Sequence, residues 1–332
     1  MADNPLSNRP ARILPVLGLV LLAAVGASLL AGSSSLRSGE VLAVLTGRSD
    51  NDTVRTILWQ IRLPRALLAA AVGATLSLGG LVFQARLRNP LAEPYILGIS
   101  GGAAIGAILG ILGGMAMFPG VTLSSFAGSM LVMGMVLLMA RGGTTGRSDA
   151  LLLAGVMLNA FCAACIMFFL SLSQSAQVHH ILFWLMGDLS MADPRRAYLL
   201  LPLLACFFLI HVHARPLNLL LTGDESAAAL GMHLQRTTWV LLGTTTLMVS
   251  IVVSQSGLVG FVGLVVPHFF RLLLGPDHRV LVPACILGGG AYLVLCDLLA
   301  RSLPAGGEMP VGVITAMIGA PVFTLMLWRA GR

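Results

Sequence analysis

The chain has 332 residues, of which 57% are hydrophobic and only 10% are charged, and its mean hydropathy is +0.92. Soluble proteins carry about 25% charged residues, so this composition excludes an ordinary soluble domain and predicts an integral membrane protein. The 20 basic residues against 13 acidic ones give a net charge of +7, and all 20 are arginine. A P-loop needs a lysine to reach the nucleotide phosphates, so a P-loop site is excluded, and the scattered arginines form no basic stripe for nucleic acid.

Apolar runs long enough to cross a bilayer, about 20 residues each, recur along the whole chain. They predict an all-α membrane protein of about ten transmembrane helices, forming a single domain over residues 1–332. The first run is too long for a signal peptide and no clear cleavage site follows it. One short helix is expected in the polar linker 34–61, near Ser38–Leu45. The expected spans are residues 13–33, 62–85, 96–116, 121–140, 150–172, 197–213, 235–256, 258–275, 281–301 and 310–328.

An even number of spans places both termini on one side of the membrane. With the termini in the cytoplasm, twelve of the 20 arginines lie inside and eight lie outside, which agrees with the positive-inside rule. Cytoplasmic termini are therefore expected. Arg62, Arg65 and Arg301 are outer arginines that need an explanation of their own.

Glycine marks the third expected span. Gly98, Gly102, Gly106, Gly110 and Gly114 recur every four residues and form one bare helix face, which favours close helix packing. The Pro-rich stretch 89–94 and the Gly-rich stretch 257–268 predict interrupted helices instead. Transporters use such interruptions where the backbone is buried or lines a cavity.

The loop 214–234 is expected in the cytoplasm and contains a short helix signal. Thr222 is a candidate N-cap, Asp224 and Glu225 suit the positive end of a helix, and Gly231 suits its end. An isolated helix this short is marginal in water. Docking into a partner protein would stabilise it, although an inert surface helix has the same pattern.

Several motifs occur in order from about residue 60 to the C-terminus, and together they resemble the permeases of the iron-siderophore, haem and cobalamin importers, the type II ABC importers. The motifs are Arg62-Leu-Pro-Arg65, Arg88-Asn-Pro-Leu-Ala-Glu-Pro94, Leu97-Gly-Ile-Ser-Gly-Gly-Ala103, Leu152-Leu-Ala-Gly155, Trp184-Leu-Met-Gly187, Gly223-Asp-Glu225 to Leu230-Gly231, Gly260 to Pro267-His268, Asp277-His-Arg279, Asp297 to Arg301, Pro310 to Thr315, and Gly319-Ala-Pro321.

The resemblance implies a ten-span permease of the bacterial inner membrane that pairs with a second copy of itself. Two cytoplasmic ATPase subunits and one periplasmic substrate-binding protein complete the assembly. The chain itself then carries no cofactor and does no chemistry, since ATP and Mg bind the partner ATPase. Residues 222–233 match the coupling helix that seats in the ATPase. The coupling residues so implied are Asp224, Glu225, Ala228, Leu230 and Gly231.

The resemblance also explains the outer arginines. Arg62, Arg65 and Arg301 match residues that pair with acidic groups on the binding protein, and the planar guanidinium suits such carboxylate contacts. Two structural alternatives remain: snorkelling to lipid headgroups, and for Arg301 an ion pair with Asp297 four residues earlier.

A cytoplasmic gate and a pathway residue follow from the same resemblance. The gate positions it implies are Asn89, Leu91, Arg147, Ser148 and Asp149, the last three in a turn that departs from the Thr/Ser-rich version of close relatives. Asn159 is the strongly polar residue of the fifth span, and an intramembrane polar group faces a cavity or another helix. Pathway lining and an interhelical hydrogen bond are both open for it.

Three alternative interpretations of the sequence are a protease, a haem-contacting histidine pair and a passive channel. Gly98-Ile99-Ser100-Gly101 has the form of a rhomboid-type protease serine motif, with His268 as a conceivable base. His179 and His180 could contact haem iron, although adjacent helical residues point in different directions. A passive channel would need charged or carbonyl filter rings, which the sequence lacks. For the cargo, an iron complex is expected first, with cobalamin or haem as the alternative.

Overall fold

The computed structural model describes residues 9–32, 38–48, 51–140, 147–304 and 307–330. Throughout these residues the chain is helices joined by turns, without a strand, as the sequence predicts. The elements long enough to matter for the membrane are α1 (Arg9–Leu30), α4 (Leu63–Leu87), α5 (Ile99–Leu112), α6 (Thr122–Met139), α7 (Arg147–Leu172), α9 (Leu200–Val212), α12 (Leu234–Ser256), α13 (Val262–Leu274), α14 (His278–Ser302) and α15 (Val311–Ala330). The short elements are α2 (Ser38–Leu45), α3 (Asp52–Thr56), η1 (Ile57–Arg62), η2 (Pro94–Leu97), η3 (Met117–Val121), α8 (Ser175–Leu185), η4 (Pro194–Leu199), α10 (Ala214–Leu220) and α11 (Asp224–Ala229).

The ten long elements coincide in order and position with the ten expected spans. Eight stretches within the described residues are long and apolar enough to cross a membrane, and α5 and α13 are shorter apolar helices. The short helix expected at Ser38–Leu45 is present as α2. The expected fold class is therefore confirmed.

Helix α4 occupies the centre of the bundle, where α12, α13 and α14 pack around it. Its apolar window is 83% buried, far more than a helix with one side in lipid. Gly73 of α4 meets Gly289 of α14, and Gly80 meets Gly263 of α13, backbone against backbone. Small residues allow this approach because no Cβ separates the helices.

The glycine face expected on the third span is largely confirmed. Gly102, Gly106 and Gly110 of α5 pack against Gly128, Ser124 and Val121, which belong to α6 and the turn before it. The face is shorter than predicted. Gly114 lies beyond the end of α5 at a positive φ of 68°, with nothing near it.

The interruption expected within 257–268 lies between α12 and α13. Helix α12 ends at Gly257, where φ is 65°, and α13 begins only at Val262. The freed backbone finds partners in other segments: Leu258 N donates to Trp184 O at 3.3 Å, and Asp188 N donates to Ser256 O at 2.8 Å. A broken helix is tolerated at membrane depth only with such replacement partners.

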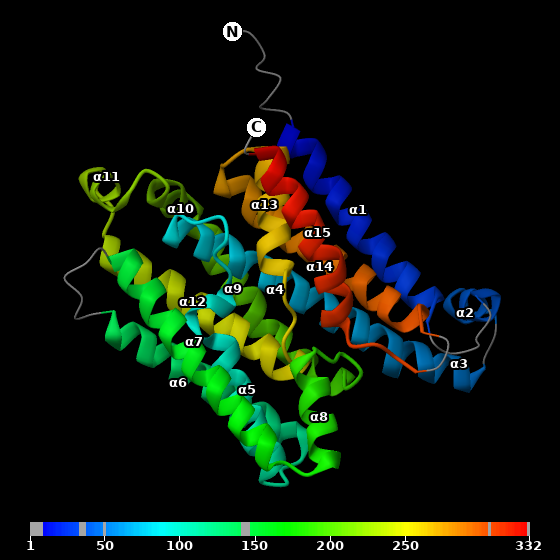
Figure 1. The fold of residues 1–332 in the computed structure, drawn as a ribbon. Coiled ribbons are helices and arrows are strands. Elements are labelled where there is room, and N and C mark those ends of the chain that lie inside the picture. Colours follow the sequence, from blue (N-terminus) through cyan, green and yellow to red (C-terminus); the bar gives the residue numbers. More distant parts are fainter. Residues whose placement is uncertain (1–8, 33–37, 49–50, 141–146, 305–306, 331–332) are drawn as a thin grey trace.

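The bundle has two distinct ends (Figure 1). The start of α1, the end of α15, and α10 and α11 lie together at one end, which we call the α11 end. Helices α2 and α3 lie at the opposite end, where α4 begins, and we call this the Arg65 end. The sequence expectation of cytoplasmic termini would make the α11 end cytoplasmic and the Arg65 end periplasmic, and this orientation remains a prediction.

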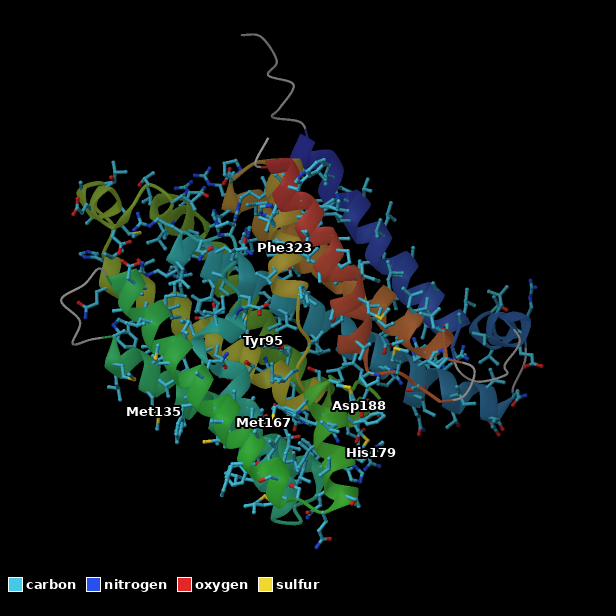
Figure 2. All side chains as sticks on the ribbon, in the orientation of Figure 1. Tyr95, Met135, Met167, His179, Asp188 and Phe323 are labelled. Atoms are coloured by element: carbon cyan, nitrogen blue, oxygen red, sulfur yellow. The ribbon has the colours of Figure 1, made fainter. Side chains whose placement is uncertain are left out.

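Helices α6 and α7 leave an apolar face uncovered. Only 22% of the α7 window and 33% of the α6 window are buried within the chain. Met167 of α7 and Met135 of α6 project outward from the bundle (Figure 2), and they are 68% and 44% exposed. This face must be covered by lipid or by another protein.

The Gly80–Gly263 contact supports a stability prediction. We expect Gly80→Ala to lower the free energy of unfolding by about 1–3 kcal/mol, because its new Cβ would overlap the Gly263 carbonyl. Gly243→Ala in α12 is the control, since a Cβ there has nothing within 4 Å. Thermal unfolding of the two purified variants in detergent measures the difference, and equal melting temperatures would contradict the prediction.

Candidate functional site

Helix α11 is shorter than the expected helix 222–233. It begins after Gly223, whose φ of 104° turns the chain, and spans Asp224–Ala229. The prediction of Thr222 as its N-cap is wrong, because the Thr222 hydroxyl instead donates to Leu219 O at 2.8 Å. Gly231, at a φ of 87°, ends the helix as expected.

The coupling residues divide between two sides of α11. Ala227 is buried against the bundle, and the Asp224 carboxylate accepts from Arg86 Nη1, which lies 3.3 Å from both of its oxygens. Glu225, Ala228, Leu230 and Gly231 are exposed. The outer side of α11 thus presents one carboxylate and an apolar side chain, Leu230, that is 66% exposed.

The loop that follows α4 contains the expected gate residues Asn89 and Leu91. Arg88 ends the helix in the left-handed conformation, with a φ of 48°. The Asn89 side chain accepts from Leu91 N at 2.9 Å, as turn-forming asparagines do. Leu91 is 47% exposed, so its side chain is free to contact another copy or a cargo.

The second part of the expected gate lies at the start of α7. The helix begins at Arg147, but the side chains of Arg147 and Ser148 lie outside the described residues. Asp149, in the first turn, is exposed. The gate role of these three residues remains a prediction.

A carboxyl group lies at the end of the gate loop. Burial raises the pKa of Glu93 to about 7, because a charged carboxylate is disfavoured away from water. Tyr95 lies two residues later, and its hydroxyl accepts from Val259 N, in the break between α12 and α13, at 3.1 Å. The gate loop is thereby tied to the interrupted helix pair.

Asn159 lies on the uncovered face of α7. Its side chain is exposed, and a Cβ added to Gly101 of α5 would be 3.1 Å from its Oδ1. No hydrogen bond of Asn159 to another helix is found among the described residues. The role of Asn159 in lining a pathway remains a prediction.

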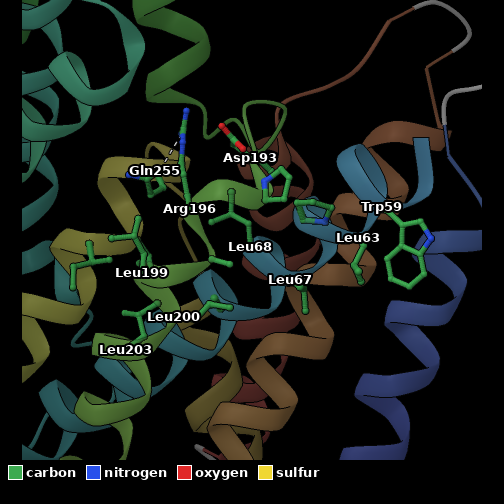
Figure 3. Close-up of a pocket in the computed structure, with 17 residues that line it drawn as sticks. Trp59, Leu63, Leu67, Leu68, Asp193, Arg196, Leu199, Leu200, Leu203 and Gln255 are labelled. Atoms are coloured by element: carbon green, nitrogen blue, oxygen red, sulfur yellow. Dashed lines mark hydrogen bonds between the residues drawn. The ribbon is translucent and has the colours of Figure 1, made fainter. Parts of the chain in front are cut away.

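An apolar cavity of about 150 Å³ lies between the start of α4, the η4–α9 segment and the end of α12 (Figure 3). Its polar edge is Arg196, which donates to Gln255 at 3.0 Å and stacks over Phe118 at 4.2 Å. A second cavity of about 440 Å³ lies beside Arg86 and Trp239. Binding pockets for drug-sized ligands measure about 300–1,000 Å³, so the first cavity is below this range and the second lies in its lower half.

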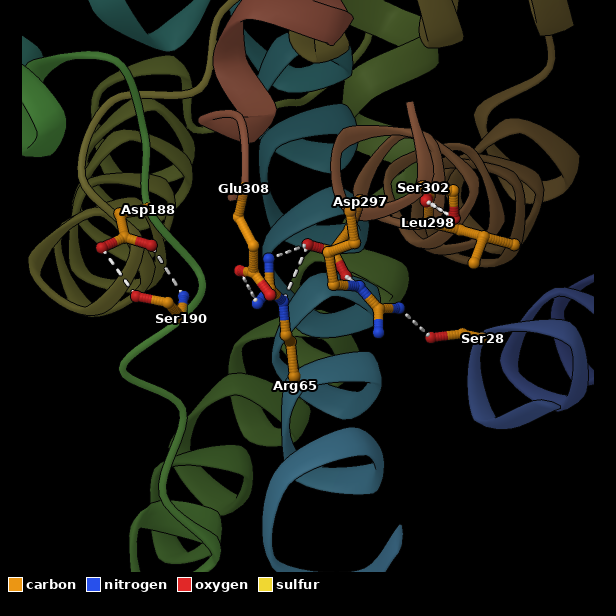
Figure 4. Close-up of polar contacts among 9 residues, drawn as sticks. Ser28, Arg65, Asp188, Ser190, Asp297, Leu298, Ser302 and Glu308 are labelled. Carbon is orange, nitrogen blue, oxygen red and sulfur yellow. Dashed lines mark hydrogen bonds and ion pairs between the residues drawn. The ribbon is translucent and has the colours of Figure 1, made fainter. Parts of the chain in front are cut away.

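The three outer arginines lie at the Arg65 end, where two of them, Arg65 and Arg301, share one carboxylate. Asp297 of α14 lies 2.9 Å from Arg65 Nη2 and 3.0 Å from Arg301 Nε (Figure 4). The ion pair expected between Asp297 and Arg301 is therefore confirmed. Arg62 donates to Leu29 O at 2.6 Å. We call Arg62, Arg65, Arg301 and Asp297 the arginine cluster.

The arginine cluster is closed in this structure. Arg62, Arg65 and Arg301 are only 3%, 6% and 4% exposed, and Asp297 is fully buried. A second carboxylate, Glu308 in the loop before α15, accepts from Arg65 Nη1 at 2.5 Å and is 34% exposed. The depth of the cluster argues against snorkelling, because a snorkelling head group lies in water.

Two of the rival patterns find no supporting geometry. Both ring nitrogens of His268 lack a hydrogen-bond partner in the described part of the chain, so His268 forms no serine–histidine pair with Ser100. The His179 and His180 rings lie 6.3 Å apart and nearly perpendicular. The described residues contain no group of three side chains that could hold a metal ion.

Two partner residues in these sites, Glu308 and Arg86, are not indicated by the sequence. Glu308 is 243 residues from Arg65, and no local spacing connects them. Arg86 and Asp224 are 138 residues apart. A lone arginine within a strongly apolar run was the available signal for Arg86, because such a charge needs a buried partner.

Asp297 is the residue on which the arginine cluster depends. We expect Asp297→Asn to destabilise the protein by about 3–5 kcal/mol, because buried Arg301 loses its paired carboxylate and buried Arg65 keeps only Glu308. Glu308→Gln removes a half-exposed partner and should cost at most about 1 kcal/mol. Thermal unfolding in detergent would rank the two variants, and a milder effect of Asp297→Asn would contradict this account.

Glu93 predicts a pH dependence of stability. Its pKa is raised from 4.5 to about 7, so the folded protein binds a proton that the unfolded chain releases. The free energy of unfolding should fall as pH rises from about 4.5 to about 7. Glu93→Gln should flatten this part of the curve, whereas Glu40→Gln, at an exposed acid, should not. Melting temperatures between pH 4.5 and 8 check it.

Comparison with known proteins agrees with the geometry. The model of the FecCD transport family matches residues 20–329. The vitamin B12 import system permease protein BtuC of Escherichia coli O127:H6 is 40% identical over 306 residues, covering 92% of this chain and 93% of its own. BtuC of Escherichia coli K12 is 39% identical over 323 residues, covering 97% and 96%.

Solved structures show the same architecture. A putative metal-chelate type ABC transporter in an inward-facing conformation is 31% identical and superposes with a TM-score of 0.86, covering 96% of this chain and 99% of its own. PsaBC from Streptococcus pneumoniae, in complex with Fab, shares the fold with a TM-score of 0.58 at 15% identity, over 83% of this chain and 94% of that one.

These relatives are permease subunits of ABC transporters, so the chain is not an enzyme, and a partner ATPase hydrolyses the ATP. The apolar helices and the relatives together indicate a multi-pass protein of a bacterial inner membrane. The match to transporter permeases over nearly the whole chain excludes the protease reading of Ser100. With a family model matching residues 20–329, the chain belongs to the FecCD transport family.

Proposed function

We propose that the chain is the permease of a cobalamin importer, moving cargo from the periplasm to the cytoplasm. The observation that supports cobalamin as the cargo is the 40% identity to vitamin B12 import permeases over 92% of the chain. The first expectation from the sequence was an iron complex, which no finding supports over cobalamin. The start of α1, the end of α15 and α11 lie at the same end of the bundle, which we assign to the cytoplasm.

The pathway lies between two copies of the chain. The α7 face supports this arrangement because it exposes the polar Asn159, and an intramembrane polar side chain faces a cavity or the interior of a bundle and not lipid. A corrinoid is larger than a drug-sized ligand, and the two cavities of about 150 and 440 Å³ within one chain lie below or in the lower half of the pocket range for drug-sized ligands. Asn159 on that face, and Leu91 below it, would line the pathway and its cytoplasmic gate.

Helix α11 is the contact for the ATPase. Glu225, Ala228 and Leu230 point away from the bundle, and a helix this short is stabilised by docking. Binding of ATP by the partner would displace α11 and thereby shift the gate. Energy enters the cycle through the different stabilities of the conformational states with and without nucleotide.

The arginine cluster is the docking site for the binding protein in this proposal. Arg62, Arg65 and Arg301 bring three positive charges against the two carboxylates of Asp297 and Glu308, so the site carries a net positive charge that suits acidic residues on a partner. The guanidinium groups are buried in the chain alone. Docking would therefore require the loop with Glu308 to move aside, so that partner carboxylates replace Glu308 at Arg65.

Reconstituted transport tests the cargo. Proteoliposomes would contain the chain, its ATPase and its binding protein, and would be offered cyanocobalamin, ferrichrome or haem in separate experiments. We expect ATP-dependent uptake of cyanocobalamin alone. Uptake of ferrichrome or haem instead would change the cargo and keep the importer, whereas uptake that is indifferent to ATP would refute the importer.

Charge reversal tests the ATPase contact. We expect Glu225→Arg to lower co-purification of the ATPase at least tenfold, because the exposed carboxylate on α11 would meet its partner with the wrong sign. Glu40→Arg makes the same change at an exposed acid of α2, at the Arg65 end, and should leave co-purification intact. Equal recovery of the ATPase with both variants would refute α11 as the contact.

A further inference from the structure

We propose that Arg86 transmits the displacement of α11 to the gate loop, residues 88–93, by holding the first residue of α11 to the last turn of α4. The inference rests on the proposed function, because it names the link between two sites that this function requires. Neither α11 nor the gate loop explains by itself how one moves the other.

The first contact is the ion pair between Arg86 and Asp224. Arg86 lies in the last turn of α4, and its side chain is 1% exposed. Its Nη1 lies 3.3 Å from both carboxylate oxygens of Asp224, whose side chain is 25% exposed. Asp224 thus turns toward the bundle, while Glu225 and Leu230 turn toward the proposed ATPase.

Burial makes this pair hard to separate. A guanidinium withdrawn from water loses its hydration, and removing its counter-charge leaves that loss uncompensated. An exposed pair would break and re-form in water at little cost. A force on α11 therefore carries the end of α4 with it.

A second contact joins the same two segments. Arg88 Nη1 lies against Gly223, where an added Cβ would be 3.3 Å from it. Helix α4 ends at Leu87. Arg86, just before this end, contacts Asp224, and Arg88, just after it, contacts Gly223.

The gate loop continues from α4 as one hydrogen-bonded unit. Asn89 N donates to Gln84 O at 3.2 Å, and Ala92 N donates to Asn89 O at 3.1 Å. Asn89 Oδ1 accepts from Leu91 N at 2.9 Å. The bonds to Asn89 hold Leu91 and Ala92 in a fixed position relative to it. A displacement of the last turn of α4, which carries Arg86, therefore also displaces Leu91.

A fixed point lies just above the link. Gln84 is buried and donates through Nε2 to Gly263 O, in α13, at 3.1 Å. Gln84 and the glycine contact at Gly80 hold the body of α4 in place. The part that moves is the segment beyond Gln84, which carries Arg86 and the gate loop.

Hydrogen–deuterium exchange of the complete complex in nanodiscs tests the link without reference to cargo. Exchange at residues 224–230 and 88–93 is compared with and without a non-hydrolysable ATP analogue. In the wild type we expect both segments to respond. In Arg86→Gln we expect the response at 224–230 to persist and that at 88–93 to fall at least fivefold.

Two further variants complete the design. Arg236→Gln neutralises an exposed arginine at the start of α12 and should keep both responses. The swap Arg86→Asp with Asp224→Arg should restore at least half of the gate response, which a merely structural arginine would not do. If Arg86→Gln does not assemble, Asp224→Asn breaks the same pair from its more exposed partner, with the same fivefold loss expected.

The outcomes separate the link from the function. A gate response in the Arg86 or Asp224 variant equal to that of the wild type overturns the link and leaves the importer standing. An α11 that does not respond to nucleotide in the wild type overturns the proposed function, and the link with it.

Discussion

Close contact between the backbone of α4 and its neighbours is the constraint on which the rest of the structure depends. Gly73 and Gly80 let α14 and α13 approach without an intervening side chain, and lipid offers no hydrophobic drive that would replace this packing. Both ends of this tightly packed helix carry charge. Arg65 starts the helix in the arginine cluster, and Arg86 ends it against α11. A helix of 25 residues measures about 37 Å at 1.5 Å per residue, so one element connects the sites at the two sides of the membrane.

The distribution of polar groups separates structure from function. Asp297 and Arg65 are buried with their partners, whereas Glu225, Leu91 and Asn159 are exposed although each lies on a surface that lipid or water alone does not suit. A buried polar group with all its hydrogen bonds stabilises one conformation, whereas an exposed side chain remains able to bind a partner protein or cargo. Arg86 combines the two properties, since its own side chain is buried and that of its partner Asp224 is 25% exposed at the α11 end. This position suits a residue that reports the movement of a partner to the interior.

Much of the fold followed from the sequence because apolar length and glycine spacing are local signals. The ten spans, the helix at Ser38–Leu45 and the break near Gly257 all depend on residues close together in the chain. Asp297 with Arg301 was likewise predictable at a spacing of four residues. Glu308 and Arg86 were not, because their partners are determined by how distant helices pack. The N-cap prediction for Thr222 failed for a related reason. A hydroxyl just before one helix can also bond to the end of the preceding helix, and Thr222 donates to Leu219 O of α10.

The sharing of Asp297 has a consequence for how this sequence can drift over generations. One carboxylate neutralises guanidinium groups from two helices, so losing it leaves Arg301 without its paired carboxylate and Arg65 with Glu308 alone. A lineage that loses Asp297 should therefore change Arg301 and Arg65 as well. Asp297 lies four residues from Arg301 and 232 from Arg65, and the three positions should accordingly be inherited together, kept or lost as one.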